Sequence, residues 1–504
     1  MGKPKIKKQY PEDIKSLVGF GTVTSATTYA ATILSIFMLF LTDYSGIDAA
    51  MGQAGYAAAF ATAFLLLTRI VDAIDDPLQG WIMDSAKECR FGKYRKFGIL
   101  GTIFIGIGSI MLFALPSFVK TNGIMLWIWC VIGYLLLDMG SAMNIATPIL
   151  QKATTDPRIR TKITSINRFG IVLAALPASF FVTIVTAVSG ADGDQGQAAV
   201  KTAVSFALLL CLITFAGIAM LKEPYRKEKA SGDEKSILKP KEIFDMIRHN
   251  KPLWAHNIGF FIGNMTYSIA SAVMMYFLKW YFCADLATGE VDLLSYAGLV
   301  GIYSLISLLP NFAAPFLAGM VQRFCKTVDR GMQFCMLSMS IGYFALFVLG
   351  VTGILKANVW LFYIICMIVA LPAGISAIFQ VLMNVECADY AEYTTGKNMT
   401  AVSNSIANVI SKAQTAIGGV IPGILLIAVG YSVDSTTGAY AGNLSSLPGM
   451  VNGLLIVTTL VPTILSFGGF LIYKLCYKVT PELRKTMTTE LNDRHARQSA
   501  EAEK

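Results

Sequence analysis

The sequence predicts an all-α polytopic membrane protein with twelve transmembrane helices in two halves of six. Three observations support this prediction. Hydrophobic residues make up 55% of the 504 positions, charged residues make up 14%, and the mean hydropathy is +0.58, which is too apolar for a soluble protein of this size. Long apolar segments alternate with short polar ones along the chain. The longest polar segment, Lys222 to Lys251, separates the sixth apolar segment from the seventh.

Each predicted span is long enough to cross the bilayer, since about 20 helical residues cross the hydrocarbon core. The twelve predicted spans are residues 17–41, 54–83, 97–117, 122–149, 169–190, 199–221, 254–282, 294–319, 331–353, 358–384, 400–431 and 450–475. The chain therefore divides into four predicted parts. These are an N-terminal half (1–221), a cytoplasmic linker (222–251), a C-terminal half (252–480) and a cytoplasmic tail (481–504).

Charge in the loops predicts the orientation. Basic residues gather after spans 2, 4 and 8, whereas the loops after spans 1, 7 and 11 are poor in them and carry aspartates. Because positive loops stay in the cytoplasm, we expect both termini there, in a protein of the cell (inner) membrane.

Several functions are excluded by what the chain lacks. The nine cysteines lie singly without a CxxC, the three histidines are dispersed, and there is no Walker-type loop. The net charge of +9 is spread over short loops, so it is not a nucleic-acid-binding surface. We therefore predict a protein that is not an enzyme, with no cofactor and no nucleic-acid partner.

Four charges stand within the otherwise apolar second span: Arg69, Asp72, Asp75 and Asp76, followed by Pro77. A carboxylate at the centre of a membrane helix costs about 2.5–3.5 kcal/mol on insertion scales, so contact with lipid is implausible. Asp72 and Asp76 are four residues apart and Arg69 precedes Asp72 by three, so the three share a helix face. The excess negative charge predicts a cation or proton site. The alternative is a charge-paired helix with no ligand.

Span 4 carries Asp138, Asn144 and Thr147. Asn144 and Thr147 share a helix face, and Asp138 is turned away from them. These side chains either line a cavity or form hydrogen bonds between helices, a common use of polar residues in membranes. Asp138 is the stronger candidate for a functional role, since a lone buried carboxylate needs a partner.

Two charged segments are candidate gates. Asp156 to Arg160 closes the loop between spans 4 and 5 and is predicted to act as a cytoplasmic gate or an anchor. Arg168, at the start of span 5, reaches the cavity or extends to the membrane interface. Asp389 and Glu392 lie at the acidic start of the loop after span 10. They either pair with the basic loops of the other half or are solvated.

Lys412 lies about a dozen residues inside span 11, too deep to reach the interface easily. We expect it to face the bundle interior, where it balances the carboxylates of span 2, binds substrate oxygens, or both.

Span 7 carries aromatic residues and asparagines that suggest a wall for stacking a sugar: Tyr267, Tyr276, Trp280, Tyr281, Asn257 and Asn264. The alternative is an interfacial aromatic belt, which we favour for Trp280 and Tyr281. Lys279 is expected to extend to the interface there.

These residues resemble those of the glycoside–pentoside–hexuronide:cation symporters, a branch of the major facilitator superfamily. The likeness lies in four stretches: Arg69–Gly80 continuing to Arg95, Asp156–Arg160 with Arg168, Asn250–Pro252, and Asp389–Gly396 followed by Lys412. The resemblance implies two six-helix halves working by alternating access. Asp72 and Asp76 match the family's coupling-cation carboxylates, which would hold Na⁺ in a sodium-coupled member. Asp75 stands where a characterised member has asparagine, and Lys412 matches a lysine near both cation and sugar.

The sequence also departs from the family. The sugar-binding aspartate of span 1 falls near Ala26 and Thr27, and that of span 4 falls at Met143, beside Asn144. An aromatic partner on span 4 is replaced by Thr147. The resemblance thus implies cation coupling, but not a galactoside pocket.

We therefore predict a secondary active transporter for the Na⁺- or H⁺-coupled symport of a sugar, glycoside or hexuronide. Its partners are this substrate, a monovalent cation and the bilayer, and we expect the monomer to be functional. Two alternatives are a lysolipid transporter on the same scaffold and a transport-silent substrate sensor. The short tail after Pro481 argues against the sensor.

Overall fold

The computed structural model describes residues 10–68, 71, 92, 94–153, 157–190, 193–223, 250–395, 410, 413–414, 417–418, 420–421, 423–424, 426–428 and 431–502. Over these residues the regular structure is helical, and the only extended pairing described is two isolated β-bridges. The predicted all-α class is confirmed.

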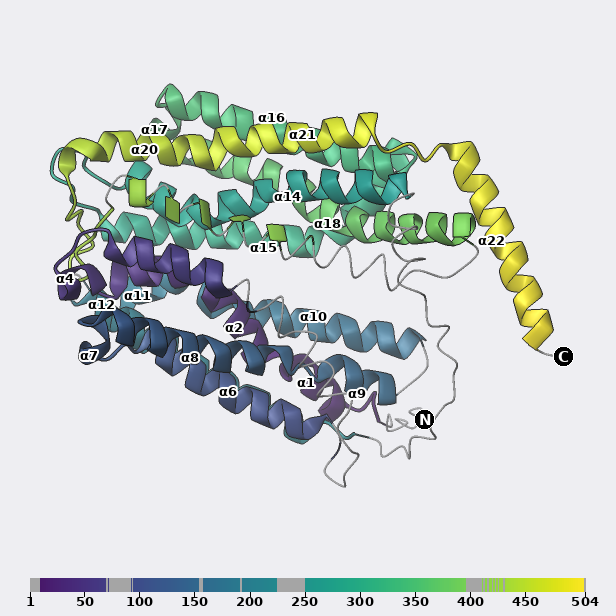
Figure 1. Ribbon diagram of the computed structural model, residues 1–504, viewed down its shortest axis with the longest axis horizontal. Helices are drawn as coiled ribbons and strands as arrows, with labels where there is room; N and C mark the ends of the chain where they lie inside the picture. The colour runs from purple at the N-terminus through teal and green to yellow at the C-terminus, as the bar shows by residue number, and fades with distance from the viewer. Residues whose placement is uncertain are drawn as a thin grey trace, which may run out of the picture. The chain divides into compact units, whose positions relative to one another are not determined.

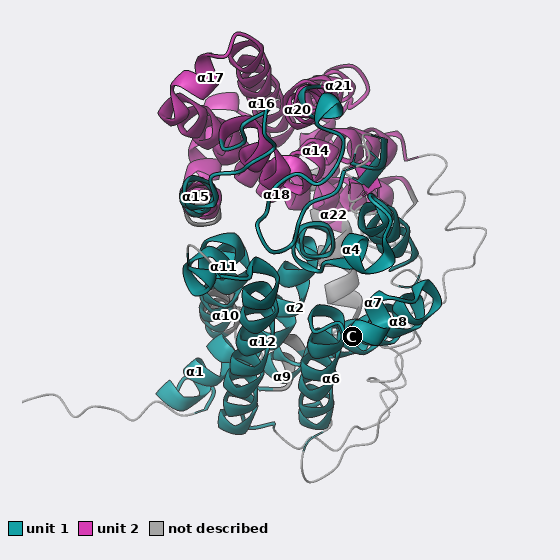
Figure 2. Cartoon of the chain, turned by 90° about the vertical axis from the view of Figure 1, so that its left-hand side faces the viewer, with its two compact units in different colours: residues 1–231, 283–301, 423–448 teal, residues 232–282, 302–422, 449–504 magenta. Residues whose placement is uncertain are grey.

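The chain forms two compact units (Figure 2). Unit 1 comprises residues 1–231, 283–301 and 423–448, and unit 2 comprises residues 232–282, 302–422 and 449–504. Each unit is thus built on one predicted half. Two connecting segments of the second half, 283–301 and 423–448, belong to unit 1.

The helices follow one another in chain order (Figure 1). Those of the first half are α1 (Ile14–Thr22), α2 (Ser25–Ser35), α3 (Phe37–Leu39), the π-helical turn η1 (Phe40–Tyr44), α4 (Ile47–Met51), a helix at Tyr56–Thr68, α6 (Arg95–Phe113), α7 (Ser117–Lys120), α8 (Gly123–Ala142), α9 (Ala146–Ala153), α10 (Pro157–Ser179), α11 (Phe181–Ser189) and α12 (Gln195–Met220). Those of the second half are α14 (Lys251–Phe277), η2 (Leu278–Phe282), α15 (Leu293–Cys325), α16 (Val328–Val351), α17 (Ile354–Ala357), α18 (Val359–Thr395), η3 (Leu444–Ser446), α20 (Leu447–Leu455), η4 (Ile456–Leu460), α21 (Val461–Leu475) and α22 (Pro481–Ala502).

Among the described residues, 8 helices are long and apolar enough to cross a membrane. A further pair, Phe169–Ser179 with Phe181–Ser189, is bent by 46°, and two shorter apolar helices occupy Tyr56–Thr68 and Leu293–Leu308. Together they fall on every predicted span except the eleventh (400–431), most of which lies outside the described residues. Of span 2 (54–83), the helix at Tyr56–Thr68 covers the first part, and nearly all of the rest lies outside the described residues.

Two helix boundaries differ from the prediction. α10 begins at Pro157 rather than near residue 169, because proline is favourable in the first turn of a helix. α18 continues to Thr395, so Asp389 and Glu392 lie on its last two turns and not in a loop. No glycine or proline interrupts the sequence between Gly374 and Gly396, so nothing local ends the helix earlier.

The burial of three side chains in the η2 turn also differs from the prediction. Lys279, Trp280 and Tyr281 are buried, with exposed fractions of 2%, 0% and 8%, rather than forming an interfacial belt. The Tyr281 hydroxyl donates a hydrogen bond to the Gly350 carbonyl at 2.8 Å, and the Lys279 ammonium lies 5.0 Å from the centre of the Trp280 ring. These contacts keep the side chains in the interior of unit 2.

In unit 1, α6 and α8 pack along glycines. A Cβ atom added at Gly101 would lie 2.9 Å from the Gly140 carbonyl oxygen, and one added at Gly108 would lie 2.7 Å from that of Gly133. The missing side chains let the two backbones approach closely, as small residues do at membrane helix interfaces.

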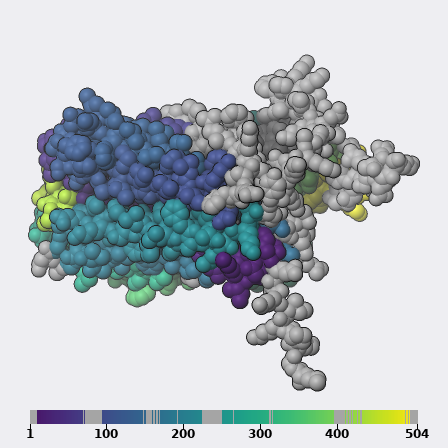
Figure 3. Space-filling view, turned by 90° about the horizontal axis from the view of Figure 1, so that it is seen from below, coloured from purple at the N-terminus to yellow at the C-terminus, as the bar shows by residue number. Residues whose placement is uncertain are grey.

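The opposite face of α6 is apolar and exposed. Leu100, Ile103, Ile107 and Ile110 recur every three or four residues and are 38–46% exposed. The surface of α6 and α8 is blue in Figure 3. A one-sided apolar stripe of this kind suits a helix that contacts lipid.

We expect Gly140→Ala to lower the stability of the folded protein. Its Cβ would lie 2.5 Å from the Gly101 carbonyl oxygen, and overpacking of this kind costs about 1–3 kcal/mol. The midpoint of thermal unfolding of the purified protein in detergent measures the effect. Gly319→Ala on α15 is the control, because nothing lies within 4 Å of its added Cβ. An equal midpoint for both variants would show that the contact between α6 and α8 tolerates a methyl group.

Candidate functional site

The whole predicted cation site, Asp72, Asp75 and Asp76, lies outside the described residues. So do the predicted gating residues Arg69 and Asp156 and the predicted coupling residue Lys412. For Thr147, Arg160 and Arg168 the structure gives the helix, α9 or α10, but not the side chain. Their roles stay predictions.

Span 4 is broken at the position where the resemblance places a sugar-binding carboxylate. α8 ends at Ala142 and α9 begins at Ala146. The exposed Asn144 lies in the break, and its Oδ1 accepts a hydrogen bond from the Ala146 amide at 3.1 Å. Helix ends leave backbone carbonyls without helical partners, and broken helices in transporters are typical of substrate and ion sites.

Span 1 is also broken, but its backbone groups are bonded by neighbouring helices. The Asn167 side chain, from α10, donates to the Phe20 carbonyl at 2.7 Å and to the Thr24 hydroxyl at 3.0 Å. The Ala26 amide donates to the Thr214 hydroxyl of α12 at 2.8 Å. The backbone between α1 and α2 is therefore hydrogen-bonded to side chains of α10 and α12. These hydrogen bonds fix the position at which α2 begins.

Two further described candidates, Thr27 and Asp138, are close to these breaks in sequence. Thr27, on α2, is half-buried and its hydroxyl donates to the Thr24 carbonyl at 2.9 Å. Asp138, on α8, is half-buried, and its carbonyl accepts a hydrogen bond from the Ser141 hydroxyl at 2.9 Å. Since α2 and α8 pack against each other, the structure brings the spans of Thr27 and Asn144 together.

Two connecting segments of unit 1 fold as matching hairpins that the sequence analysis missed. In the first, the Gly289 amide donates to the Asp285 carbonyl at 2.8 Å, and in the second the Gly438 amide donates to the Asp434 carbonyl at 2.7 Å. Both glycines have positive φ, 76° and 74°, as this tight turn requires. The repeated pattern Asp-x-x-Thr-Gly was the sequence signal.

The hairpins contact each other and the first half of the chain. The Tyr440 amide donates to the Gly289 carbonyl at 2.8 Å, and the Gly196 amide at the start of α12 donates to the Ser435 carbonyl at 3.1 Å. Unit 1 therefore includes backbone contacts between connections that lie far apart in the sequence.

A buried carboxyl group binds the second connecting segment, 423–448. Asp43, in η1, is 3% exposed. It accepts hydrogen bonds from the Tyr431 hydroxyl at 3.0 and 3.2 Å and from the Thr42 hydroxyl at 2.8 Å. Tyr431 is itself 1% exposed, so water has little access to this contact. A hydrogen bond shielded in this way contributes more than one at the surface.

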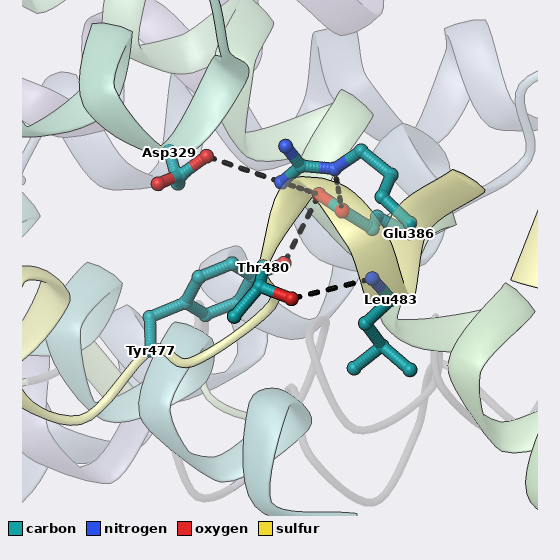
Figure 4. A network of polar contacts seen from close by, with 6 residues as sticks. Asp329, Glu386, Tyr477, Thr480 and Leu483 are labelled. Carbon is teal, nitrogen blue, oxygen red and sulfur yellow. Dashed lines mark hydrogen bonds and ion pairs between the residues drawn. The ribbon is translucent and has the colours of Figure 1, made fainter. Parts of the chain in front are cut away.

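In unit 2, Asp389 and Glu392 are half-buried, and a second charged group near them escaped the sequence analysis (Figure 4). Arg484, at the start of α22, forms an ion pair with Glu386 of α18 and another with Asp329 of α16 at 3.1 Å. The signal was a carboxylate three residues before Asp389 and an arginine just after the last span.

Arg484 stays charged in the network of Figure 4. The Tyr477 hydroxyl also donates to Glu386, at 3.2 Å. Burial acts to lower the pKa of Arg484, but its hydrogen bonds and ion pairs with Glu386 and Asp329 outweigh that effect and raise it. The network ties the tail helix α22 to the ends of α16 and α18.

Comparisons with known proteins agree with the predicted family. Residues 18–480 match the family model described as MFS/sugar transport protein. An uncharacterized symporter, YnaJ of Bacillus subtilis (strain 168), is 27% identical over 92% of this chain and 91% of its own. The isoprimeverose transporter of Lactiplantibacillus pentosus is 25% identical over 94% of this chain and 89% of its own. The inner membrane symporter YicJ of Escherichia coli (strain K12) is 24% identical over 95% of each chain.

Solved structures show the same fold. The nucleoside transporter NupG covers 91% of this chain and 99% of its own, with a TM-score of 0.54 and 15% identity. A bacterial homologue of the iron transporter ferroportin in an inward-facing state covers 90% of this chain and 98% of its own, with a TM-score of 0.52 and 11% identity. The predicted major facilitator fold is confirmed. The protein is an integral membrane transporter and not an enzyme. It belongs to the MFS/sugar transport protein family.

Proposed function

We propose that this protein is a secondary active transporter that carries a sugar, glycoside or hexuronide together with Na⁺ or H⁺ by alternating access. The family match over residues 18–480 carries the proposal. One relative named "Putative glycoside/cation symporter YagG" and another named "Isoprimeverose transporter" support it. We further propose a monomer in the cell membrane with both termini in the cytoplasm, as the loop charges favour.

The coupling ion enters at the acidic cluster of span 2. Na⁺ binding to, or protonation of, Asp72, Asp75 and Asp76 removes negative charge from the cavity, and Lys412 balances what remains. Substrate then binds beside the breaks in spans 1 and 4, with Asn144 and Thr27 as its proposed contacts. Coupling is reciprocal, so substrate tightens cation binding by the same factor as the cation tightens substrate binding.

The hydrogen bonds of Asp43 supply closure on the outer side. The predicted topology puts Asp43 and Tyr431 on the face opposite the basic loops. The segment 423–448 connects spans 11 and 12 of the second half, whereas Asp43 follows span 1. A contact between them holds the two connections together when the outer side is closed.

The test is uptake by proteoliposomes that contain the purified protein. The radiolabelled panel is isoprimeverose, lactose, a phenyl glucuronide and a lysophospholipid, with inward sodium and proton gradients imposed separately. We expect one of the three sugars to accumulate under one gradient or both. Transport of the lysophospholipid alone would overturn the proposal in favour of a lipid substrate.

Asp75 adds a third carboxylate to a site where a characterised relative of the chain has an amide. Three such groups within about a turn and a half cannot all stay ionised in a low dielectric, so at least one takes up a proton near neutral pH. We expect uptake to depend on pH between about 5.5 and 8.5, and Asp75→Asn to flatten that dependence and favour sodium. Sodium-only, pH-independent uptake by the unmutated protein would leave Asp75 as a sodium ligand or a partner of Arg69.

A further inference from the structure

Unit 2 contains a cavity of about 210 Å³ between α14, α15, α16 and α18. Where α15 approaches α18, a Cβ atom added at Gly374 would lie 3.0 Å from the Cβ of Pro310. On the same face of α18, Ala370, Ala373 and Ala377 line the cavity. These small side chains leave a space that longer ones would fill.

Three tyrosines from three helices line this cavity: Tyr267 of α14, Tyr303 of α15 and Tyr343 of α16. Tyr343 is 5% exposed, whereas Tyr267 is 47% exposed. Within the described part of the chain, none of their hydroxyls is among the buried polar atoms that lack a partner. Each hydroxyl both donates and accepts hydrogen bonds, so the cavity wall offers polar groups to an occupant beside its apolar surface.

The charge and size of the cavity narrow the choice of occupant. Its described lining includes no acidic or basic side chain, so the part of a ligand held there is neutral. Its volume is below the roughly 300–1,000 Å³ of sites for drug-sized ligands, which suits one sugar ring and not a lysolipid.

The lining also matches a sugar in its chemistry. Tyrosine offers an apolar ring face and a polar tip, and a pyranose offers a C–H face and hydroxyls at its rim. The Ser307 hydroxyl, which donates to the Ser304 carbonyl at 2.8 Å, adds a further acceptor at the cavity wall. An acyl chain has no group that would bond to four hydroxyls.

We propose that this cavity is a subsite for one neutral pyranose ring of the transported substrate, an inference that rests on the proposed function. The subsite favours neutral glycosides over hexuronides, because a carboxylate would be buried here without a cation. Tyr267, Tyr303 and Tyr343 hold the ring by its hydroxyls and faces.

Cys366 provides a direct probe, because it lines the cavity and is 7% exposed. We would replace the other eight of the nine cysteines by serine and measure the rate at which N-ethylmaleimide labels Cys366. Isoprimeverose or lactose, whichever the panel identifies, is expected to slow this labelling, and the phenyl glucuronide less so. A matched variant that keeps only the exposed Cys476 should be labelled at the same rate with and without sugar.

Variants of the lining test the same subsite by sugar binding in detergent. Tyr303→Phe and Tyr343→Phe each remove one hydroxyl and should weaken binding about three- to tenfold. Ala370→Leu fills the cavity and should weaken it more. Tyr363→Phe, a buried tyrosine of α18 that is not among the lining residues, should bind the sugar as the unmutated protein does. The thermal midpoint of each variant shows whether it is folded. If Ala370→Leu does not fold, Tyr303→Phe and Tyr343→Phe still test the subsite.

The outcomes separate the subsite from the proposed function. If the unmutated protein transports a sugar but neither labelling nor the variants respond to it, the subsite is wrong and the transporter stands. Protection of Cys366 by the lysophospholipid and not by sugar would make the cavity a lipid site and would also overturn the subsite. If no sugar of the panel is transported or bound, the proposed function fails and the subsite with it.

Discussion

Asp76→Asn and Asp72→Asn are each expected to abolish sugar accumulation driven by a cation gradient. Each substitution removes one carboxylate from the proposed cation site, so cation binding no longer favours the loaded, closed state. Downhill exchange of labelled for unlabelled sugar should persist, because it does not require net cation movement. Uptake by proteoliposomes under an inward gradient, compared with exchange, measures the two effects separately.

Asp434→Asn is the matched control for these variants. Asp434 lies in the second hairpin, where its side chain accepts a hydrogen bond from the Thr436 amide at 2.8 Å, and asparagine supports the same turn. This variant should accumulate sugar normally. Full sugar accumulation by both span 2 variants would show that Asp72 and Asp76 do not form the cation site.

Tyr431→Phe is expected to shift the protein toward the state open on the outer side. It removes the hydroxyl that donates to both carboxyl oxygens of Asp43 and leaves that buried group with one donor fewer. Losing such a bond costs about 1–3 kcal/mol, equivalent to roughly five- to 150-fold in the conformational equilibrium. The measurement is the labelling rate of a cysteine introduced at Thr27 by a membrane-impermeant reagent applied from outside, in a background without native cysteines.

Tyr440→Phe provides the comparison for this effect. Its hydroxyl lies 3.3 Å from that of Ser446, within the same segment, so its loss leaves the bond between Asp43 and Tyr431 in place. We expect faster labelling in Tyr431→Phe and no change in Tyr440→Phe. Equal rates in both variants would show that Asp43 and Tyr431 do not hold the outer side closed.

The sequence predicted the helices well because membrane spans are specified locally. About twenty apolar residues satisfy their own backbone within one helix, so hydropathy alone locates them. The boundaries were less predictable. α10 begins at Pro157, twelve residues before the apolar run, because its first turns are helical but polar.

The span 1 break and the long-range contacts could not be read from local sequence. Span 4 is interrupted at Asn144, and Pro148 marks the place, because proline has no N–H to donate to the Asn144 carbonyl four residues earlier. The span 1 break, by contrast, is held by Asn167 and Thr214 from other helices. The pairing of Arg484 with Glu386 joins residues 98 positions apart. Such contacts depend on how helices pack, and hydropathy contains no information about that.

The sequence prediction of the candidate site rests mainly on charge, and it stays a prediction. A carboxylate cluster inside an apolar span is costly unless cations or protons neutralise it, whereas neutral polar residues serve both packing and binding. Asn257, predicted as part of a sugar wall, is 2% exposed and its side chain donates to the Leu253 carbonyl at 2.9 Å. Of the span 7 aromatics, Tyr267 lines the cavity, whereas Trp280 is fully buried elsewhere.

Reciprocal coupling between cation and sugar tests the central proposal most directly. The measurement is the affinity of the purified protein for its sugar at several sodium concentrations and pH values, paired with the cation's affinity at several sugar concentrations. We expect sodium or protons to tighten sugar binding, and sugar to tighten binding of that cation by the same factor. A sugar affinity that stays the same at every sodium concentration and pH would contradict cation-coupled symport by this protein.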